Sequence, residues 1–309
     1  MTSNDSQESS VIPAMESASE TVRRIFGNDG SSLGAEIADE ASRYERLNAA
    51  LFPLPSRTRC LAVANQKGGV GKTTSAINIA AAIGLKGKKT LLLDCDPQGN
   101  ASSGVGIRRN RIGATTYDIL IGRARAEDAI IKTEYKNLSV LPSSMPLAAA
   151  ELELADLEDR AFRLKNALES VKNNYDYIFI DCPPSLGMLT INALTASEGV
   201  IVPMQCEYFS LEGLTQILST VKQVKRLYNP DLSLTGILIT MHNGRLNLSV
   251  QVLDELKKHY ADKLFSTPIS RNVRLSEAPS FGMPIQYYDK YSKGSSAYDD
   301  IAAELLERT

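Results

Sequence analysis

A single segment constrains the fold of this chain more than any other feature. An apolar run at Cys60–Asn65 leads into a loop with glycine at positions 68, 69 and 71, and Ser75–Leu85 is rich in Ala, Ile and Leu at helical spacing. Glycines let backbone N–H groups converge on a polyphosphate without Cβ clashes, and the helix that follows presents its positive N-terminal dipole to the same anion. The segment therefore predicts a strand, a phosphate-binding loop and a helix, in that order.

Two lysines set this loop apart. The usual pattern G-x-x-x-x-G-K-[ST] is not met, because Gln66 occupies its first position, and Lys67 adds a cation. In such a loop we expect Lys72 to reach the β and γ phosphates and the Thr73 hydroxyl to ligate Mg²⁺. The predicted nucleotide-binding residues of the loop are Lys67, Gly68, Gly69, Val70, Gly71, Lys72, Thr73 and Thr74.

Further short apolar runs alternate with segments of helical periodicity along the rest of the chain. Because these runs are continuous, they are typical of strands buried on both faces, which requires helices above and below a mainly parallel sheet. We therefore expect a doubly wound α/β domain. The expected strands are Cys60–Asn65, Thr90–Asp94, Leu138–Leu141, Tyr177–Asp181, Val200–Pro203 and Gly236–Thr240, with two more near Leu264 and Ile285. The expected helices are Lys72–Leu85, Pro146–Val171, Leu211–Tyr228, Ser249–Tyr260 and Ser295–Leu306.

Carboxylates stand at the ends of two expected strands. Asp94 and Asp96 end the second strand, where Pro97 and Gly99 stop extended structure, and Asp181 ends the fourth strand before a Pro-Pro-Ser turn. In open parallel sheets, ligands bind at the carboxyl ends of the strands. We therefore expect Asp96 to orient a water in line with the γ-phosphate, Asp94 to support the Mg²⁺ shell, and Asp181 to bind Mg²⁺ through water.

These motifs together resemble one family. Lys67–Thr73 matches the deviant Walker A motif of the ParA/MinD group of P-loop ATPases, in which the extra lysine crosses a dimer interface to touch the partner's nucleotide. The string D-x-D-P-Q-G-N-A at Asp94–Ala101 resembles the first switch of ParA partition ATPases and departs from the MinD version. Asp181–Gly187 resembles the D-x-P-P-x-x-G second switch. The resemblance covers about residues 59–309 and implies an ATP-dependent homodimer in which Lys67 acts across the interface.

The C-terminal third carries a further resemblance. Arg271–Gly282 is similar to a segment of chromosomal, Soj-type ParA proteins. In that family, arginines here and in the turn after Gly236–Thr240 bind the DNA backbone without sequence preference, which implies contacts from Arg245, Arg271 and Arg274. The family also holds adenine near these strand ends. The matching candidates are Met241 and Pro268, for which core packing is an equally open explanation.

Composition excludes several other classes of protein. The 34 basic and 36 acidic residues give a net charge of -2, so any nucleic-acid site must be a local patch. The cysteines Cys60, Cys95, Cys182 and Cys206 are widely spaced, which favours buried thiols in a reducing cytosol over disulfides, zinc or iron–sulfur ligation. No apolar run approaches the ~18 residues of a membrane span, and no signal peptide is evident, so we expect a cytoplasmic protein.

The first 58 residues differ from the rest of the chain. They contain ten Ser, no Lys, nine acidic residues and five Arg. We expect an acidic extension at 1–58, mostly disordered or with one short helix at 35–47, ahead of a ParA-type ATPase domain at 59–309. The extension is too short for the helix-turn-helix domain of the larger plasmid ParA proteins.

The resemblance implies ATP-dependent DNA partitioning. An ATP-bound sandwich dimer would bind double-stranded DNA of the nucleoid, and slow, Mg²⁺-dependent hydrolysis, stimulated by a ParB-like partner at a centromere site, would release it. One alternative is a MinD-like membrane regulator, which needs a basic amphipathic C-terminal helix where this chain has the acidic Ile301–Thr309. The other is an iron–sulfur ATPase resembling nitrogenase iron protein, which needs bridging cysteines at the dimer face. Whether the cargo is a chromosome or a plasmid stays open.

Overall fold

The structure is a computed structural model that describes residues 52–309. The expected helix at 35–47 and most of the expected extension lie outside the described residues. Those extension residues that are described make several contacts. The backbone oxygen of Phe52 accepts a hydrogen bond from Lys88 Nζ at 2.5 Å, and Arg57 forms an ion pair with Glu198 at 3.1 Å.

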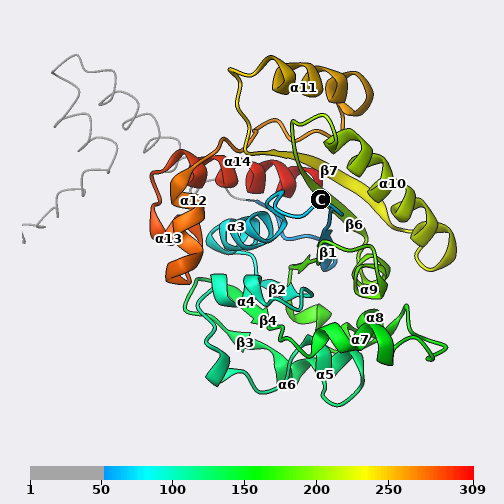
Figure 1. Ribbon diagram of the computed structural model, residues 1–309. Coiled ribbons are helices and arrows are strands. Elements are labelled where there is room, and N and C mark those ends of the chain that lie inside the picture. The colour runs from blue at the N-terminus through cyan, green and yellow to red at the C-terminus, as the bar shows by residue number, and fades with distance from the viewer. Residues whose placement is uncertain (1–51) are drawn as a thin grey trace, which may run out of the picture. The chain divides into compact units, whose positions relative to one another are not determined.

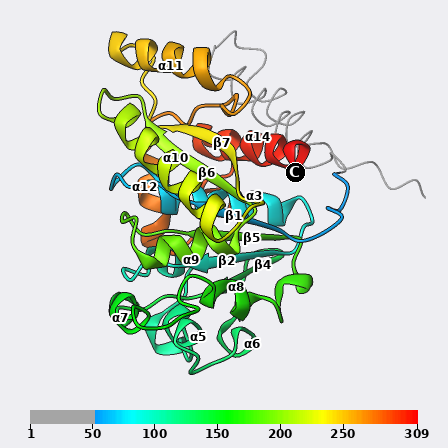
Figure 2. The same cartoon turned by 90° about the vertical axis from the view of Figure 1, so that its right-hand side faces the viewer.

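One seven-stranded sheet forms the centre of the described region, with the strand order β3-β4-β2-β5-β1-β6-β7. The strands β4, β2, β5, β1, β6 and β7 pair in parallel, and only the short edge strand β3 pairs antiparallel. Figure 2 shows this order running from β7 down to β4. The bounds are β1 Arg59–Val63, β2 Thr90–Asp94, β3 Ile131–Lys132, β4 Leu138–Leu141, β5 Tyr177–Asp181, β6 Gly199–Gln205 and β7 Ser233–Thr240.

Helices cover both faces of the sheet, because the strands are apolar on both sides. Figure 1 shows α3, α12, α13 and α14 on one side of the strands and α8, α9 and α10 on the other. The longer helices are α3 Lys72–Leu85, α9 Met188–Ala196, α10 Ser210–Leu227, α11 Asn247–Tyr260 and α14 Lys293–Arg308. The shorter ones are α4 Asn100–Gly104, α5 Thr116–Leu120, α6 Ala126–Ala129, α7 Leu147–Glu153, α8 Arg163–Leu168, α12 Val273–Glu277 and α13 Ile285–Tyr288; 3-10 turns lie at Arg109–Arg111, Lys172–Asn174 and Ala278–Phe281.

Alternate residues of each strand enter two separate cores. Along β1, Leu61 and Val63 pack with α3 and α14, whereas Ala62 packs with α9 and α10. The same division holds in β5, where Phe179 lies in the first core and Ile178 in the second. This layering confirms the predicted doubly wound α/β class.

Two sequence expectations near the end of the chain are wrong. Residues near Ile285 form the helix α13, because Pro284 precedes it with φ −59° and the Ile285 N–H donates to Asn78 Oδ1 on α3 at 2.7 Å. Leu264 makes only an isolated bridge with Ile237 and no strand.

The single helix expected at Pro146–Val171 is divided into α7 and α8. The side chain of Asn192 on α9 donates to the Arg160 carbonyl at 2.7 Å and accepts from the Leu164 N–H at 3.1 Å. A side chain from another helix thus satisfies the backbone groups at the break, which removes the need for a continuous helix.

Candidate nucleotide site

The glycine loop joins β1 to α3 at the carboxyl edge of the sheet. Gly69 and Gly71 have φ values of 71° and 85°, a region that favours glycine, and a Cβ atom at Gly68 or Gly69 would meet no heavy atom within 4 Å. The free space beside Gly68 and Gly69 leaves the loop open to a bound anion. Helix α3 begins directly afterwards at Lys72, as the sequence predicts.

Neighbouring strand ends hold the loop in place through polar side chains. Asn65 donates to the Pro203 carbonyl at 2.7 Å and accepts from the Lys67 N–H at 3.0 Å. Thr240, at the end of β7, donates its hydroxyl to the Val70 carbonyl at 2.8 Å. Gln205, at the end of β6, donates to the Gly69 carbonyl at 3.1 Å. Asn65, Thr240 and Gln205 each stand at the end of an apolar run, but no motif in the sequence marks them as site residues.

Lys72 is buried at the start of α3, and its ammonium donates to the Lys67 carbonyl at 3.0 Å. Burial lowers the pKa of Lys72, while the charges of Asp181 and Asp96 oppose that shift. Lys72, Asp96 and Asp181, which the sequence predicts as site residues, therefore share one electrostatic environment.

Asp94 and Asp181 lie side by side because β2 and β5 pair with these two residues in register. Both carboxyls are fully buried. Burial raises the pKa of Asp94 to about 6, against the effect of its hydrogen bonds from Ser102. Burial and the adjacent Asp94 raise the pKa of Asp181 well above its usual range, and Thr73 and Lys72 oppose this shift.

The two carboxyls differ in their partners. Asp94 accepts three hydrogen bonds, from the Asp96 N–H and from the N–H and hydroxyl of Ser102. Neither oxygen of Asp181 makes a well-formed hydrogen bond among the described residues, although the Thr73 hydroxyl lies near enough to favour the ionised carboxyl. An unpartnered buried carboxylate is costly unless a cation or donor joins it, so Asp181 fits the expected Mg²⁺ role better than Asp94 does.

The donor set also suits Mg²⁺ chemically. Within 52–309, no cluster of three or more His, Cys, Asp or Glu side chains could hold a metal by itself. Mg²⁺ keeps several waters and commonly takes one or two carboxylates plus substrate phosphates. Thr73 and Asp181 beside a phosphate loop meet that requirement.

A pocket of about 470 Å³ continues from the loop toward α12 and contains Gly71, Thr74 and Met241 in its lining. Met241 has a φ of 49°, which is unusual for a residue with a Cβ, and it also lines an adjoining pocket of about 420 Å³. Pro268 is not part of either lining. The geometry thus brings Met241, but not Pro268, next to the phosphate loop.

The three arginines implied for DNA binding are all exposed on loops or short helices at this edge. Arg245 follows β7, and Arg271 lines the two pockets that meet at Met241. Arg274 is paired within its own chain, with Glu277 at 2.9 Å and Asp289 at 3.5 Å. Its charge is therefore partly neutralised locally, which the sequence spacing alone did not reveal.

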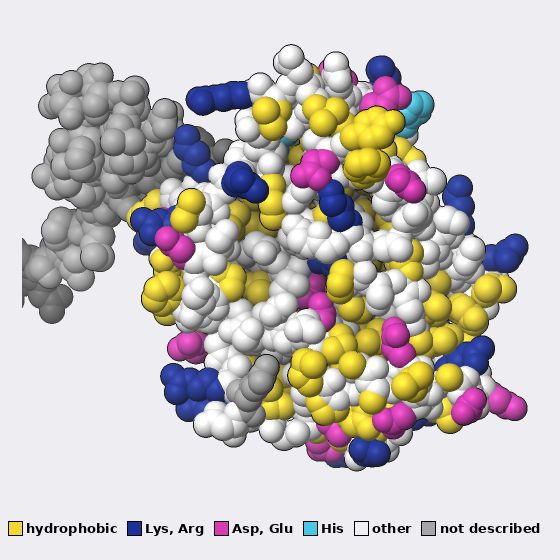
Figure 3. All heavy atoms as spheres, viewed as in Figure 1, with side chains coloured by type: hydrophobic (Ala, Val, Ile, Leu, Met, Phe, Trp, Pro, Cys, Tyr) yellow, Lys and Arg dark blue, Asp and Glu magenta, His cyan; other side chains and the backbone are white. Residues whose placement is uncertain are grey.

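Lys67 extends away from the loop and forms an ion pair with Glu207 at 2.5 Å. Tyr208 and Phe209 follow Glu207, and each is 71% exposed. Hydrophobic side chains also gather over α11 at the top of Figure 3, where Leu246, Leu248 and Val250 are exposed. The area around Lys67 therefore carries exposed apolar groups, which are typical of protein–protein contact sites.

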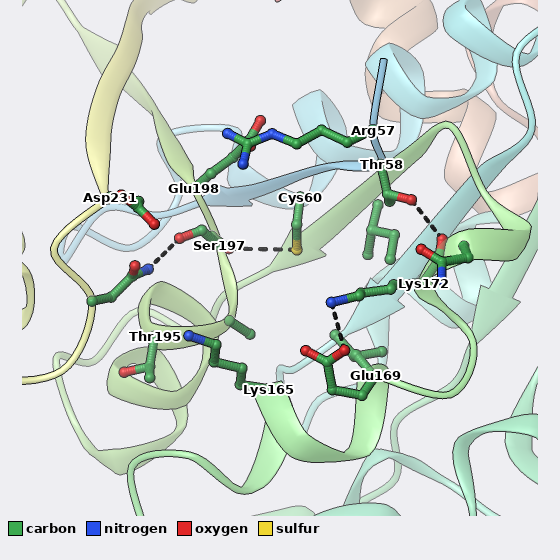
Figure 4. Close-up of a pocket in the computed structure, with 15 residues that line it drawn as sticks. Arg57, Thr58, Cys60, Lys165, Glu169, Lys172, Thr195, Ser197, Glu198 and Asp231 are labelled. Carbon is green, nitrogen blue, oxygen red and sulfur yellow. Dashed lines mark hydrogen bonds and ion pairs between the residues drawn. The ribbon is translucent and has the colours of Figure 1, made fainter. Parts of the chain in front are cut away.

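A different pocket, of about 280 Å³, lies at the amino edge of the sheet (Figure 4). Two pairs of its charged side chains form ion pairs: Lys172 with Glu169 at 2.5 Å, and Arg57 with Glu198 at 3.1 Å. Cys60, which lines it, lies 3.9 Å from the Ser197 hydroxyl, and burial raises the pKa of that thiol to about 12. Such a thiol is unreactive, so nothing here matches the chemistry of the carboxyl edge.

The four cysteines are free thiols. Cys95 and Cys182 are fully buried directly after the strand ends at Asp94 and Asp181, which agrees with the predicted buried thiols. A fully buried thiol does not suit a cluster shared with a second chain at a dimer face.

Comparisons with known proteins agree with this site. A family model described as an AAA domain matches residues 58–234. The sporulation initiation inhibitor protein Soj of Bacillus subtilis is 53% identical over 247 residues, covering 80% of this chain and 98% of that protein. The chromosome partitioning protein ParA of Caulobacter vibrioides is 49% identical over 252 residues, covering 81% of this chain and 94% of that protein.

Solved structures share the fold. A cobyrinic acid a,c-diamide synthase from Mycobacterium smegmatis, with bound ATP analog and magnesium, superposes with a TM-score of 0.71 at 38% identity, over 81% of this chain and 95% of that chain. The cell division ATPase MinD of Pyrococcus furiosus gives a TM-score of 0.69 at 26% identity, over 81% of this chain and 99% of that chain.

Proposed function

Because this chain belongs to the ParA/Soj family of chromosome-partitioning ATPases, we propose that its carboxyl-edge site hydrolyses ATP slowly to control a DNA-bound dimer. The cofactors are ATP and Mg²⁺. The observation that carries the proposal is the convergence of Lys72, Asp96 and the unpartnered Asp181 beside an open glycine loop.

Different residues of this chain bind the phosphates, bind Mg²⁺ and orient the attacking water. The N–H groups of Gly68–Gly71 and the ammonium of Lys72 bind the β and γ phosphates, and Thr73 and Asp181 hold the Mg²⁺. Bound Mg²⁺ neutralises charge that develops on the phosphates. Asp96 orients the attacking water through a hydrogen bond.

Dimerisation brings in Lys67. When Lys67 separates from Glu207, the Lys67 ammonium becomes free to contact the phosphates of the nucleotide bound to a second copy. The exposed Tyr208 and Phe209 supply apolar area to the contact between the two copies. The exchange of partners costs little, because an exposed ion pair contributes about 0–1 kcal/mol.

The DNA contacts are proposed for Arg245, Arg271 and Arg274, which are exposed at the same edge. A monomer offers few cations, since residues 59–309 carry a net charge of only +2 from 29 basic and 27 acidic residues. A dimer doubles the number of aligned arginines, and phosphate contacts act together through counterion release. We infer that DNA binding requires ATP, does not depend on the DNA sequence and places the protein on the nucleoid. We also infer that a ParB-like partner stimulates ATP hydrolysis.

A membrane-surface function is less favoured. The apolar residues Ile301, Ala302 and Leu305 of α14 are fully buried against α3 and the sheet, so that face of the helix is not available to lipid. No helix in the described region combines the length and apolar character needed to cross a membrane.

The test is a filter-binding titration with unrelated duplexes, in ATP and in ADP, across a range of salt. We expect ATP-dependent binding that falls steeply with salt, and Arg274→Ala should reduce the slope of log affinity against log salt by roughly 0.9 for each DNA phosphate that the variant no longer neutralises. Arg125→Ala is a matched control, because Arg125 is likewise exposed and paired with an acid three residues later. Sedimentation with liposomes completes the design. Lipid binding without ATP-dependent DNA binding would refute the proposal and favour the MinD-like function.

A further inference from the structure

The carboxylate of Asp94 is held almost entirely by one residue of α4. Its Oδ2 accepts hydrogen bonds from the Ser102 N–H at 2.7 Å and from the Ser102 hydroxyl at 2.6 Å. Its Oδ1 accepts from the Asp96 N–H at 3.2 Å. Asp94 and Ser102 are both buried, where hydrogen bonds to a carboxylate are stronger than neutral ones.

These bonds close a loop that contains Asp96. The loop runs from Asp94 at the end of β2 to Ser102 in α4, and Asp96 lies within it. Asp96 shapes the same loop, since its Oδ1 accepts from the Gln98 N–H at 2.9 Å and its carbonyl accepts from the Gly99 N–H at 2.9 Å. The position of Asp96 therefore depends on a loop whose C-terminal end is held to Asp94 by the hydrogen bonds of Ser102.

The Ser102 hydroxyl also accepts a hydrogen bond, from the Ser143 N–H at 3.0 Å. It thus donates to β2 and accepts from the segment after β4. Among uncharged side chains of this size, a hydroxyl donates and accepts with one atom far better than a thiol does. This double requirement distinguishes Ser102 from its neighbour Ser103, which is exposed and donates only to the Asn100 carbonyl at 3.2 Å.

We propose that Ser102 is a positioning residue for ATP hydrolysis: it fastens the Asp94–Ser102 loop so that Asp96 is oriented toward the attacking water. This inference rests on the proposed role of Asp96. Ser102 touches neither nucleotide nor water in this mechanism. It acts by limiting the orientations of Asp96, and a small misplacement of a catalytic group costs a large factor in rate.

The test compares Ser102→Ala, Ser102→Thr and the control Ser103→Ala in the full-length chain. Two quantities are measured: kcat and KM for ATP, and hydrogen exchange of the amides of residues 96–102 without nucleotide. We expect Ser102→Ala to lower kcat about 10–100-fold with KM within about threefold of wild type, and to speed amide exchange in the loop. Ser102→Thr should restore both quantities, because threonine keeps a hydroxyl that can donate and accept with one atom. Ser103→Ala should resemble wild type.

The outcomes separate this role from others. Wild-type kcat in Ser102→Ala, or a rise in KM without a fall in kcat, would overturn the proposal, as would a folded Ser102→Thr that fails to restore kcat. If circular dichroism shows that Ser102→Ala does not fold, Ser102→Cys takes its place, since a thiol is a weaker donor of similar shape, and an undiminished kcat there would equally overturn the proposal. A wild-type protein without ATPase activity would refute the proposed function. Unchanged amide hydrogen exchange at residues 96–102 in Ser102→Ala would refute only the proposal that Ser102 restrains the Asp94–Ser102 loop.

Discussion

At the amino edge of the sheet, three basic side chains near the pocket of Figure 4 form ion pairs: Arg57 and Arg59 both contact Glu198, and Lys172 contacts Glu169. At the carboxyl edge, Asp181 is buried with neither oxygen satisfied among the described residues. The glycine loop beside it leaves space that no side chain of the described region fills.

The difference indicates where ligands bind. Paired charges already have their interaction energy in the free protein, so a ligand gains little by replacing them. Unpartnered buried groups retain a penalty that a ligand can remove, and such sites are where functional groups concentrate. The volumes agree with this difference, since the amino-edge pocket of about 280 Å³ is smaller than the pocket of about 470 Å³ beside the glycine loop.

Lys72→Ala should give the largest effect at the carboxyl edge. The variant loses the cation that faces the β and γ phosphates, and we expect ATP hydrolysis to fall at least about 100-fold. Phosphate release in Mg²⁺ and ATP measures this. Lys86→Ala, at the other end of α3, serves as the control. Unchanged turnover in Lys72→Ala would show that the glycine loop is not the nucleotide site.

Asp96→Ala should also lose about 10²–10⁴-fold in hydrolysis, because the proposed loss is that of water positioning. Unlike Lys72→Ala, it should still bind ATP, and the protein should accumulate as a dimer. Light scattering in ATP and Mg²⁺ checks the dimer. A monomer under these conditions, or normal phosphate release, would contradict the role of Asp96.

Asp181→Asn tests the unpartnered carboxyl directly. Because burial raises the pKa of Asp181 above its unfolded value, this carboxyl destabilises the fold increasingly as pH rises from about 4 toward the raised pKa, and the penalty fades as pH falls back toward about 4. We expect the variant to melt at a higher temperature than wild type at pH 8 in EDTA, by about 2–4 °C for each kcal/mol regained. The same variant should lose stabilisation by Mg²⁺ and ATP. A lower melting temperature in EDTA would mean that Asp181 has a structural partner.

The sequence predicts the parts of this site that depend on local chemistry. Glycines at 69 and 71 require positive φ, and parallel strands bring their carboxyl ends to one edge, so Asp94 and Asp181 could be placed together before their register was known. The apolar runs that precede these two carboxylates predict β2 and β5 with the observed ends, at Asp94 and Asp181.

Contacts that depend on how loops turn could not be predicted. Asn65 reaches the Pro203 carbonyl and Lys67 reaches Glu207, both across well over one hundred positions of sequence. Even the nearby bond between Ser102 and Asp94 depends on the turn between them. The sequence predicts a strand where α13 lies, because a short apolar run near Ile285 carries no period that separates a strand from a helix.

Asp299 offers a buried carboxyl away from the nucleotide site. Burial raises its pKa to about 7, Lys86 opposes the shift, and Asp300 adds to it. The folded pKa exceeds the unfolded one, so stability falls as pH rises from about 4 to about 7 and then levels off. Asp299→Asn should therefore be more stable than wild type at pH 8, by at most about 4 kcal/mol, and the gain should vanish near pH 4. Thermal melts at the two pH values measure this, with Asp300→Asn as the control. A gain that is independent of pH would exclude titration of Asp299 as its cause.

The smallest effect is expected at the amino edge, from Lys172→Ala. Lys172 and Glu169 are 42% and 55% exposed, so water and salt screen their ion pair, and such pairs contribute about 0–1 kcal/mol. A double-mutant cycle with Glu169→Ala, measured by urea unfolding, should give a coupling energy within that range. ATP affinity and turnover should be unchanged, because the pair lies at the opposite edge from Lys72. If Lys172→Ala instead altered turnover more than about twofold, the amino-edge pocket would be coupled to the nucleotide site, and paired charges could no longer be taken as a sign of a structural role in this fold.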